Sequence, residues 1–146
     1  MKVAVVTGGA SGLGKGIAER LAKDGFSVLI SDLNQNLLDQ TEQEFLDKGY
    51  AIKQFQGNVS IQKDQKALAQ VALDDFGRID VWVNNAGVES VVPFSDITQE
   101  QLEKVFAIDV FSVVYGTQAA AEIMKQQDGI GKIINACSIA GHESYE

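Results

Sequence analysis

Apolar and polar positions follow two alternating periods along the chain, which predict strands and helices in turn. Short apolar runs rich in β-branched residues predict strands buried on both faces, and apolar residues three and four apart predict helices that bury one side. The predicted strands cover residues 2–6, 27–31, 50–55, 80–84 and 132–137. The apolar positions of the predicted helices lie within residues 13–22, 37–46, 68–76 and 98–124.

Capping residues and glycines mark the ends of the predicted helices. Ser60 is placed to cap the third helix, and Thr98 and Gln101 form the Thr-x-x-Gln pattern of a capping box before the fourth. A glycine in the left-handed conformation is expected just after each helical stretch, at Gly25, Gly49, Gly77 and Gly129. Strands and helices that alternate over short links predict an α/β fold with a parallel sheet. We expect a Rossmann-type three-layer sandwich with strand order 3-2-1-4-5.

A glycine-rich turn joins the first predicted strand to the first predicted helix, with the sequence Thr-Gly-Gly-Ala-Ser-Gly-Leu-Gly at residues 7–14. Backbone N–H groups and the positive dipole end of a helix N-terminus favour a bound phosphate. Glycine suits such a turn because a Cβ would hold the ligand's oxygens away from the backbone. A plain strand–helix loop is the alternative. The predicted pyrophosphate site consists of Gly8, Ser11, Gly12, Leu13 and Gly14.

Asp32 ends the second predicted strand, eighteen residues after Gly14. A carboxylate there can accept hydrogen bonds from the hydroxyls of an adenosine ribose, and it repels the 2′-phosphate of NADP. Neither Leu33 nor Ser11 offers that phosphate a positive charge. Capping of the next helix is the alternative role for Asp32. We favour the ribose role, which predicts NAD rather than NADP as the cofactor.

Three further motifs follow predicted strands at the spacing of successive strand–helix units. They are Gly57-Asn58-Val59-Ser60, Asn84-Asn85-Ala86-Gly87, and the segment 134–141 that contains Ser138. With the glycine turn, they resemble the motifs of the short-chain dehydrogenase/reductase family over the whole chain.

This resemblance implies a single NAD-binding Rossmann domain over residues 1–146 and assigns roles to particular residues. The implied cofactor site includes Asn58, Val59, Asn85, Ala86 and Gly87. Ser138 is implied to hydrogen-bond the substrate oxygen, with the greatest effect as this oxygen gains charge during hydride transfer. We assign no metal site.

Two residues depart from the family's pattern. Asn58 stands where the family usually has Asp, and we expect its amide oxygen to accept a hydrogen bond from the adenine amino group instead. A turn role is the alternative for Asn58. Asp109 stands where the family usually has an Asn that holds a helix distortion and a water of the proton relay. We therefore do not count Asp109 as catalytic.

Within the family, residues 84–89 and 132–143 are similar to bacterial diacetyl and acetoin reductases. This similarity implies NADH-dependent reduction of a small ketone such as diacetyl or acetoin. The family's catalytic Tyr, with a Lys four residues later, has no counterpart, because Tyr145 is too close to Ser138 and only Glu146 follows it. We therefore expect a C-terminally truncated chain with an incomplete sheet and no turnover of its own. A catalytically inactive NAD-binding fragment is the alternative function.

Composition and charge narrow the possible partners. The net charge of −8 argues against nucleic acid and anionic membranes, which favour basic surfaces. No long apolar span or secretory segment is visible, and a single cysteine suits a reducing compartment, so we expect a cytoplasmic protein. We expect His142 in an exposed loop and Cys137 as a small core residue. The expected partners are a small ketone or alcohol and, through uncovered apolar surface, further copies of the chain.

Overall fold

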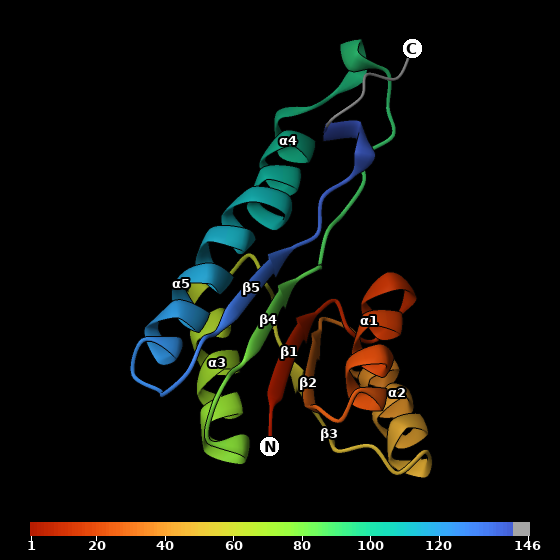
Figure 1. Ribbon diagram of the computed structural model, residues 1–146. Coiled ribbons are helices and arrows are strands. Elements are labelled where there is room, and N and C mark those ends of the chain that lie inside the picture. The colour runs from red at the N-terminus through yellow and green to blue at the C-terminus, as the bar shows by residue number, and fades with distance from the viewer. Residues whose placement is uncertain (142–146) are drawn as a thin grey trace.

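The computed structural model describes residues 1–141, which form a five-stranded parallel sheet between two layers of helices (Figure 1). The strands are β1 (Val3–Thr7), β2 (Ser27–Asp32), β3 (Ile52–Gln56), β4 (Val81–Asn84) and β5 (Lys132–Asn135). Their order is β3-β2-β1-β4-β5, and each neighbouring pair is parallel. The predicted fold class and strand order are confirmed.

Helices cover both faces of the sheet (Figure 1). On one face, α1 (Gly12–Lys23) and α2 (Gln35–Asp47) pack over a core that includes Ala4 and Val6 of β1. On the other face, α3 (Gln62–Phe76) and α5 (Ser112–Met124) pack over a core that includes Val5. Alternate residues of β1 thus enter different cores, which explains why its first four residues are all apolar.

The predicted helix over residues 98–124 is divided into three parts. It begins as α4 (Gln99–Val105), continues as a π-helical turn, η2 (Phe106–Phe111), and ends as α5. The predicted capping box is confirmed: Thr98 Oγ1 accepts from the Gln101 N–H at 3.2 Å, and Gln101 Oε1 accepts from the Thr98 N–H at 2.9 Å. At the start of α5, the Ser112 hydroxyl donates to the carbonyl oxygen of Ile108 in η2. A serine bond to a carbonyl one turn earlier commonly bends a helix.

Other helix ends agree with the sequence in part. The four glycines expected to be left-handed have φ angles between +78° and +98°. The expected cap of α3 is wrong, because the N-cap position is Ile61 and no side chain caps it. The Ser60 hydroxyl instead donates to Asn58 Oδ1 at 2.7 Å. Ser60 lies one residue before the N-cap, and its side chain belongs to the turn that precedes α3.

A charged clamp joins β1 and β4 at their amino ends. The Asp80 carboxylate accepts from the Val3 N–H at 2.8 Å and from the Arg78 guanidinium at 2.7 Å. Burial raises the pKa of Asp80, but hydrogen bonds from Arg78 and Val3 outweigh it, so this pKa lies below its ordinary value. Asp80 is 8% exposed, so its carboxylate is largely shielded from water, whereas the Arg78 side chain is 37% exposed.

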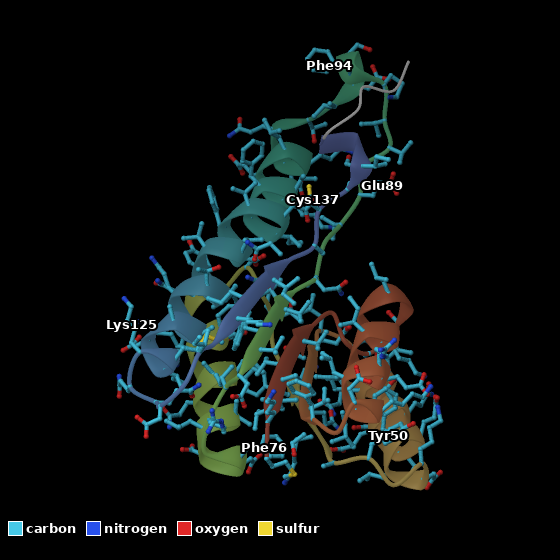
Figure 2. All side chains as sticks on the ribbon, in the orientation of Figure 1. Tyr50, Phe76, Glu89, Phe94, Lys125 and Cys137 are labelled. Atoms are coloured by element: carbon cyan, nitrogen blue, oxygen red, sulfur yellow. The ribbon has the colours of Figure 1, made fainter. Side chains whose placement is uncertain are left out.

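Residues 86–111 and 136–141 extend beyond the carboxyl ends of the strands, and we call them the projecting region (Figure 1). Figure 2 shows Phe94 near its tip, with Glu89 and Cys137 closer to the sheet. Phe94 is 92% exposed, and the region also contains the one-turn helices η1 (Phe94–Asp96) and η3 (Ile139–Gly141). Cys137 is exposed, so its predicted place in the core is wrong. Within residues 1–141, no helix combines the length and apolar character that a membrane span requires.

Candidate functional site

The carboxyl ends of the central strands surround an open cavity of about 450 Å³. Parallel sheets with helices on both faces leave a crevice at this position. Its lining contains all the residues that we predicted to bind the cofactor: Gly8, Ser11, Gly12, Leu13, Gly14, Asp32, Asn58, Val59, Asn85, Ala86 and Gly87. The remaining lining residues, which we did not predict to bind the cofactor, are Leu33, Gly57, Val88, Ile108 and Ala136.

The turn between β1 and α1 contributes an uncapped helix N-terminus to this cavity. Gly8 and Gly12 have φ angles of +63° and +51°, which favour glycine. A Cβ on Gly14 would collide with the Gly8 carbonyl oxygen and lie 2.5 Å from Asn85 Nδ2. Ser11 is the N-cap of α1, but its side chain makes no capping bond, and the first turn has no acidic residue. The N–H groups of this first turn can therefore bind an anion.

Thr7 joins this turn to the loop after β4. Its hydroxyl accepts from the N–H groups of Asn85 and Ala86 at 3.0 and 3.1 Å and donates to the Val83 carbonyl at 3.3 Å. The Asn85 side chain returns the contact by donating to the Thr7 carbonyl at 3.0 Å. We did not assign Thr7 a role from the sequence. The sequence feature that could have identified Thr7 is a polar residue at the end of an otherwise apolar strand.

Asn84 connects β4 to β5 inside the sheet rather than lining the cavity. Its Oδ1 accepts from Trp82 Nε1 at 2.7 Å, and its Nδ2 donates to Asn135 Oδ1 at 2.8 Å. A Cβ on Gly116 of α5 would collide with Asn84 Oδ1, so the helix can approach this network only through a glycine. The two asparagines of the motif thus differ in role: Asn84 holds strands together, and Asn85 faces the cavity.

Asp32 is the only charged residue in the described lining of the cavity. Its Oδ1 accepts from the Asn34 N–H at 3.1 Å, and no residue within 1–141 hydrogen-bonds to its Oδ2. Asn34, rather than Asp32, is the N-cap of α2, because its side chain accepts from the Leu37 N–H at 3.2 Å. The alternative role of Asp32, as the cap of α2, is therefore wrong, because Asn34 has that role. One carboxylate oxygen remains able to accept from a ligand's hydroxyl groups.

The Asn58 side chain is engaged differently from our expectation. Its Oδ1 accepts from both the N–H and the hydroxyl of Ser60, at 3.0 and 2.7 Å. An amide oxygen has two lone pairs, and Ser60 occupies both. The expected hydrogen bond from an adenine amino group to this oxygen therefore does not fit the structure. Asn58 therefore holds the turn through its bonds from Ser60 and also lines the cavity.

Ser138 follows β5 and Asp109 contacts the loop after β4, whereas Asp32 ends β2 on the other side of β1. Ser138 is exposed and is not among the lining residues, although Ala136, two residues earlier, is. The Ser138 carbonyl accepts from the Gly141 N–H at 3.0 Å. Asp109 lies in η2, and its Oδ1 accepts from the Val88 N–H at 2.9 Å. Asp109 thus contacts the site through the loop that follows β4.

His142 and Tyr145 lie outside the described residues. Among residues 1–141, no three His, Cys, Asp or Glu side chains lie close enough together to hold a metal ion.

Comparison with known proteins identifies close relatives of this chain. Residues 2–146 match the family model described as short chain dehydrogenase. A diacetyl reductase of Staphylococcus epidermidis that forms (S)-acetoin is 55% identical over 145 residues, or 99% of this chain and 56% of that enzyme. An L-2,3-butanediol dehydrogenase of Corynebacterium glutamicum is 39% identical over 148 residues, or 99% of this chain and 57% of that enzyme.

A solved structure agrees with these sequence matches. It is a short-chain dehydrogenase/reductase from Burkholderia phymatum in complex with NAD, with a TM-score of 0.95 and 32% identity. The match covers 99% of this chain and 51% of that one. The chain therefore spans about half the length of the relatives it matches.

Proposed function

This chain belongs to the short-chain dehydrogenase family, and we propose that residues 1–146 form the NAD-binding domain of an oxidoreductase that reduces a small ketone. One observation carries the proposal: a single cavity gathers an uncapped helix N-terminus, Asp32 and the loop after β4. The proposed substrate is diacetyl or acetoin, because the diacetyl reductase of S. epidermidis shares 55% of its residues with the chain over the matched part.

The cavity lining fits the parts of a dinucleotide. Apart from the neighbouring residues and the backbone of α1 itself, no heavy atom lies within 4 Å of the position that a Cβ on Gly12 would take, so this side of the turn is open to a phosphate. Asp32 offers Oδ2 to ribose hydroxyls, and the lining has no cationic side chain for a 2′-phosphate. These features favour NAD over NADP. When bound, NADH would supply the hydride.

In this proposal, the chain's residues bind and orient the reactants. Thr7 and Asp109 hold the loop after β4 at the cavity through their bonds to Asn85 and Val88. Ser138 would hydrogen-bond the substrate oxygen, an interaction that strengthens as this oxygen becomes an alkoxide. In the printed sequence, no Tyr is followed by a Lys four residues later, although the family uses this pair to deliver the proton. We infer that the 146-residue chain binds NAD without reducing a ketone by itself.

Calorimetric titration of NAD and NADP tests the cofactor assignment. We expect NAD to bind at least about tenfold more tightly, because Asp32 repels the 2′-phosphate. Asp32→Ala should weaken NAD binding and narrow this preference. Asp47→Ala removes the same charge from the end of α2, outside the cavity, and should change neither affinity. Equal affinities of the unaltered chain for NAD and NADP would contradict the proposal.

A second measurement addresses turnover. NADH absorbance should stay constant when the chain is mixed with diacetyl or acetoin. Consumption of NADH at the rate of a full-length relative would show that the chain supplies its own proton donor, and the binding-only proposal would then be wrong.

A further inference from the structure

The side chain of Asn58 is fixed by the loop that follows β3. The Asn58 N–H donates to Asp64 Oδ2 at 2.9 Å, and its carbonyl accepts from the Ile61 N–H at 3.0 Å. The bonds from Ser60 to Oδ1 add two further constraints on the same residue. The Gly57 N–H donates to the Asp32 carbonyl at 3.1 Å, which ties this loop to the end of β2. Asn58 is therefore a preorganised part of the wall that also carries Asp32.

The Ser60 N–H determines which way the Asn58 amide faces. A backbone N–H can only donate, so the side-chain atom 3.0 Å from it must be the oxygen. Rotation of the amide by half a turn would place two N–H donors against each other. The NH₂ group consequently faces away from Ser60, and no acceptor within residues 1–141 is hydrogen-bonded to it. Asn58 is half-buried in the cavity lining, where Nδ2 is the polar side-chain atom left for a ligand.

We propose that Asn58 acts as a hydrogen-bond donor toward the base of the bound dinucleotide, and that the site therefore does not select for an exocyclic amino group. This inference rests on the proposed binding of NAD. Adenine carries an amino group, which is a donor, beside ring nitrogens, which are acceptors. Hypoxanthine has a carbonyl oxygen in place of the amino group, and its neighbouring ring nitrogen N1 carries a hydrogen and is a donor. A donor at position 58 can bond to that carbonyl oxygen or to a ring nitrogen. The chain should therefore accept nicotinamide hypoxanthine dinucleotide as well as NAD.

Asn58→Asp inverts this polarity with almost no change in shape. One carboxylate oxygen can keep the two bonds from Ser60, and the other takes the place of Nδ2 as an acceptor. An acceptor that faces the six-position of the base favours the adenine amino group and opposes the hypoxanthine carbonyl at the same position. Both dinucleotides have the same charge, so repulsion by the added carboxylate cancels when their affinities are compared as a ratio.

The test is calorimetric titration of NAD and nicotinamide hypoxanthine dinucleotide into the unaltered chain, Asn58→Asp and Asn58→Ala. We expect the affinities of the unaltered chain for the two ligands to lie within about threefold of each other. In Asn58→Asp, the ratio of the affinity for NAD to that for the hypoxanthine ligand should be about tenfold higher than in the unaltered chain. Asn58→Ala should lose affinity for the hypoxanthine ligand at least as much as for NAD, and this variant decides the matter if Asn58→Asp does not fold. The inference would be overturned if this ratio of affinities were the same in the unaltered chain and in Asn58→Asp. It would also be overturned if Asn58→Ala lost affinity for NAD but not for the hypoxanthine ligand. Failure of the unaltered chain to bind either ligand would instead overturn the proposed function.

Discussion

Strands β1 and β5 belong to the same parallel sheet, separated only by β4, but their surroundings are very different. All five residues of β1 are buried, whereas β5 has three exposed residues and one partly buried residue. Val5 in β1 is fully buried, and Ile134 in β5 is 50% exposed. Similar β-branched side chains are thus core in one strand and surface in the other. An apolar run defines a strand, but the elements packed around it determine how much of it is buried.

The contrast extends from these strands to the projecting region and the helix that leads from it. Most of the large apolar side chains exposed within residues 1–141 follow residue 90: Val91, Phe94, Ile97, Leu102, Phe106, Val110, Phe111, Val114, Ile130, Ile134 and Ile139. Earlier parts of the chain place most of theirs in two cores on the faces of the sheet. The stability of the described fold should therefore come mainly from β1, β2, β4 and the helices that cover them.

The largest effect should come from a matched pair of leucine truncations. Leu29 of β2 is fully buried, and Leu102 of α4 is 50% exposed. Leu29→Ala should lower the free energy of unfolding by about 2–5 kcal/mol, because it leaves a cavity in the core. Leu102→Ala should lower it by less than about 0.5 kcal/mol. Denaturant titration measures both, and equal losses would show that the projecting region contributes to the core.

An intermediate effect should come from two carboxylates that each accept a backbone N–H. Asp80 accepts from Val3 in the buried clamp, and Asp109 accepts from Val88 in the projecting region. Asp80→Asn should cost about 1–3 kcal/mol, because it also removes a charge-assisted bond to Arg78. Asp109→Asn keeps an oxygen for an exposed N–H and should cost much less.

The clamp also predicts a pH dependence. The pKa of Asp80 is lowered on folding, so its stabilisation is fully present above the ordinary aspartate pKa of 3.8 and is lost as the pH falls through the folded value. The free energy of unfolding, measured at pH values from about 6 down to about 2, should therefore fall less steeply with pH in Asp80→Asn than in the unaltered chain. Identical slopes would mean that Asp80 titrates alike in the folded and unfolded states.

The smallest effect concerns self-association. Phe106 in η2 is 46% exposed, and Leu46 in α2 is 50% exposed. If the exposed apolar surface around η2 brings copies together, Phe106→Glu should weaken self-association by about tenfold, because association would then bury a charge. Leu46→Glu places the same charge outside the projecting region and should have little effect. Sedimentation velocity over a range of concentrations distinguishes the two, and equal effects would contradict this expectation.

The sequence predicts those features that short stretches of chain determine alone. The strand–helix alternation, the capping box at Thr98 and the left-handed glycines all depend on neighbours within a few residues, and the structure contains them. The residues predicted to bind the cofactor meet in one cavity, because each follows a strand whose place in the sheet is fixed by right-handed crossovers.

Features that depend on a choice between partners were not predictable in this way. The Ser60 hydroxyl could cap α3 or bond to Asn58, and only the geometry of the turn decides between them. The exposure of Cys137 depends on which elements cover the end of β5, which no local pattern encodes. The π-helical turn at 106–111 lies next to such a choice, because the Ser112 hydroxyl bonds to the Ile108 carbonyl that would otherwise serve the helix's own bonds.

The network around Asn84 also gives the molecule an optical probe of its own. Trp82 is the chain's single tryptophan; it is fully buried and donates to Asn84, which in turn bonds to Asn135 of β5. Its fluorescence emission therefore reports on the seam between β4 and β5, whereas circular dichroism reports mainly on the helices. Coincident unfolding curves from the two signals would mean that the seam opens with the whole domain. An earlier fluorescence change would measure how readily β5 separates from a sheet that is otherwise intact.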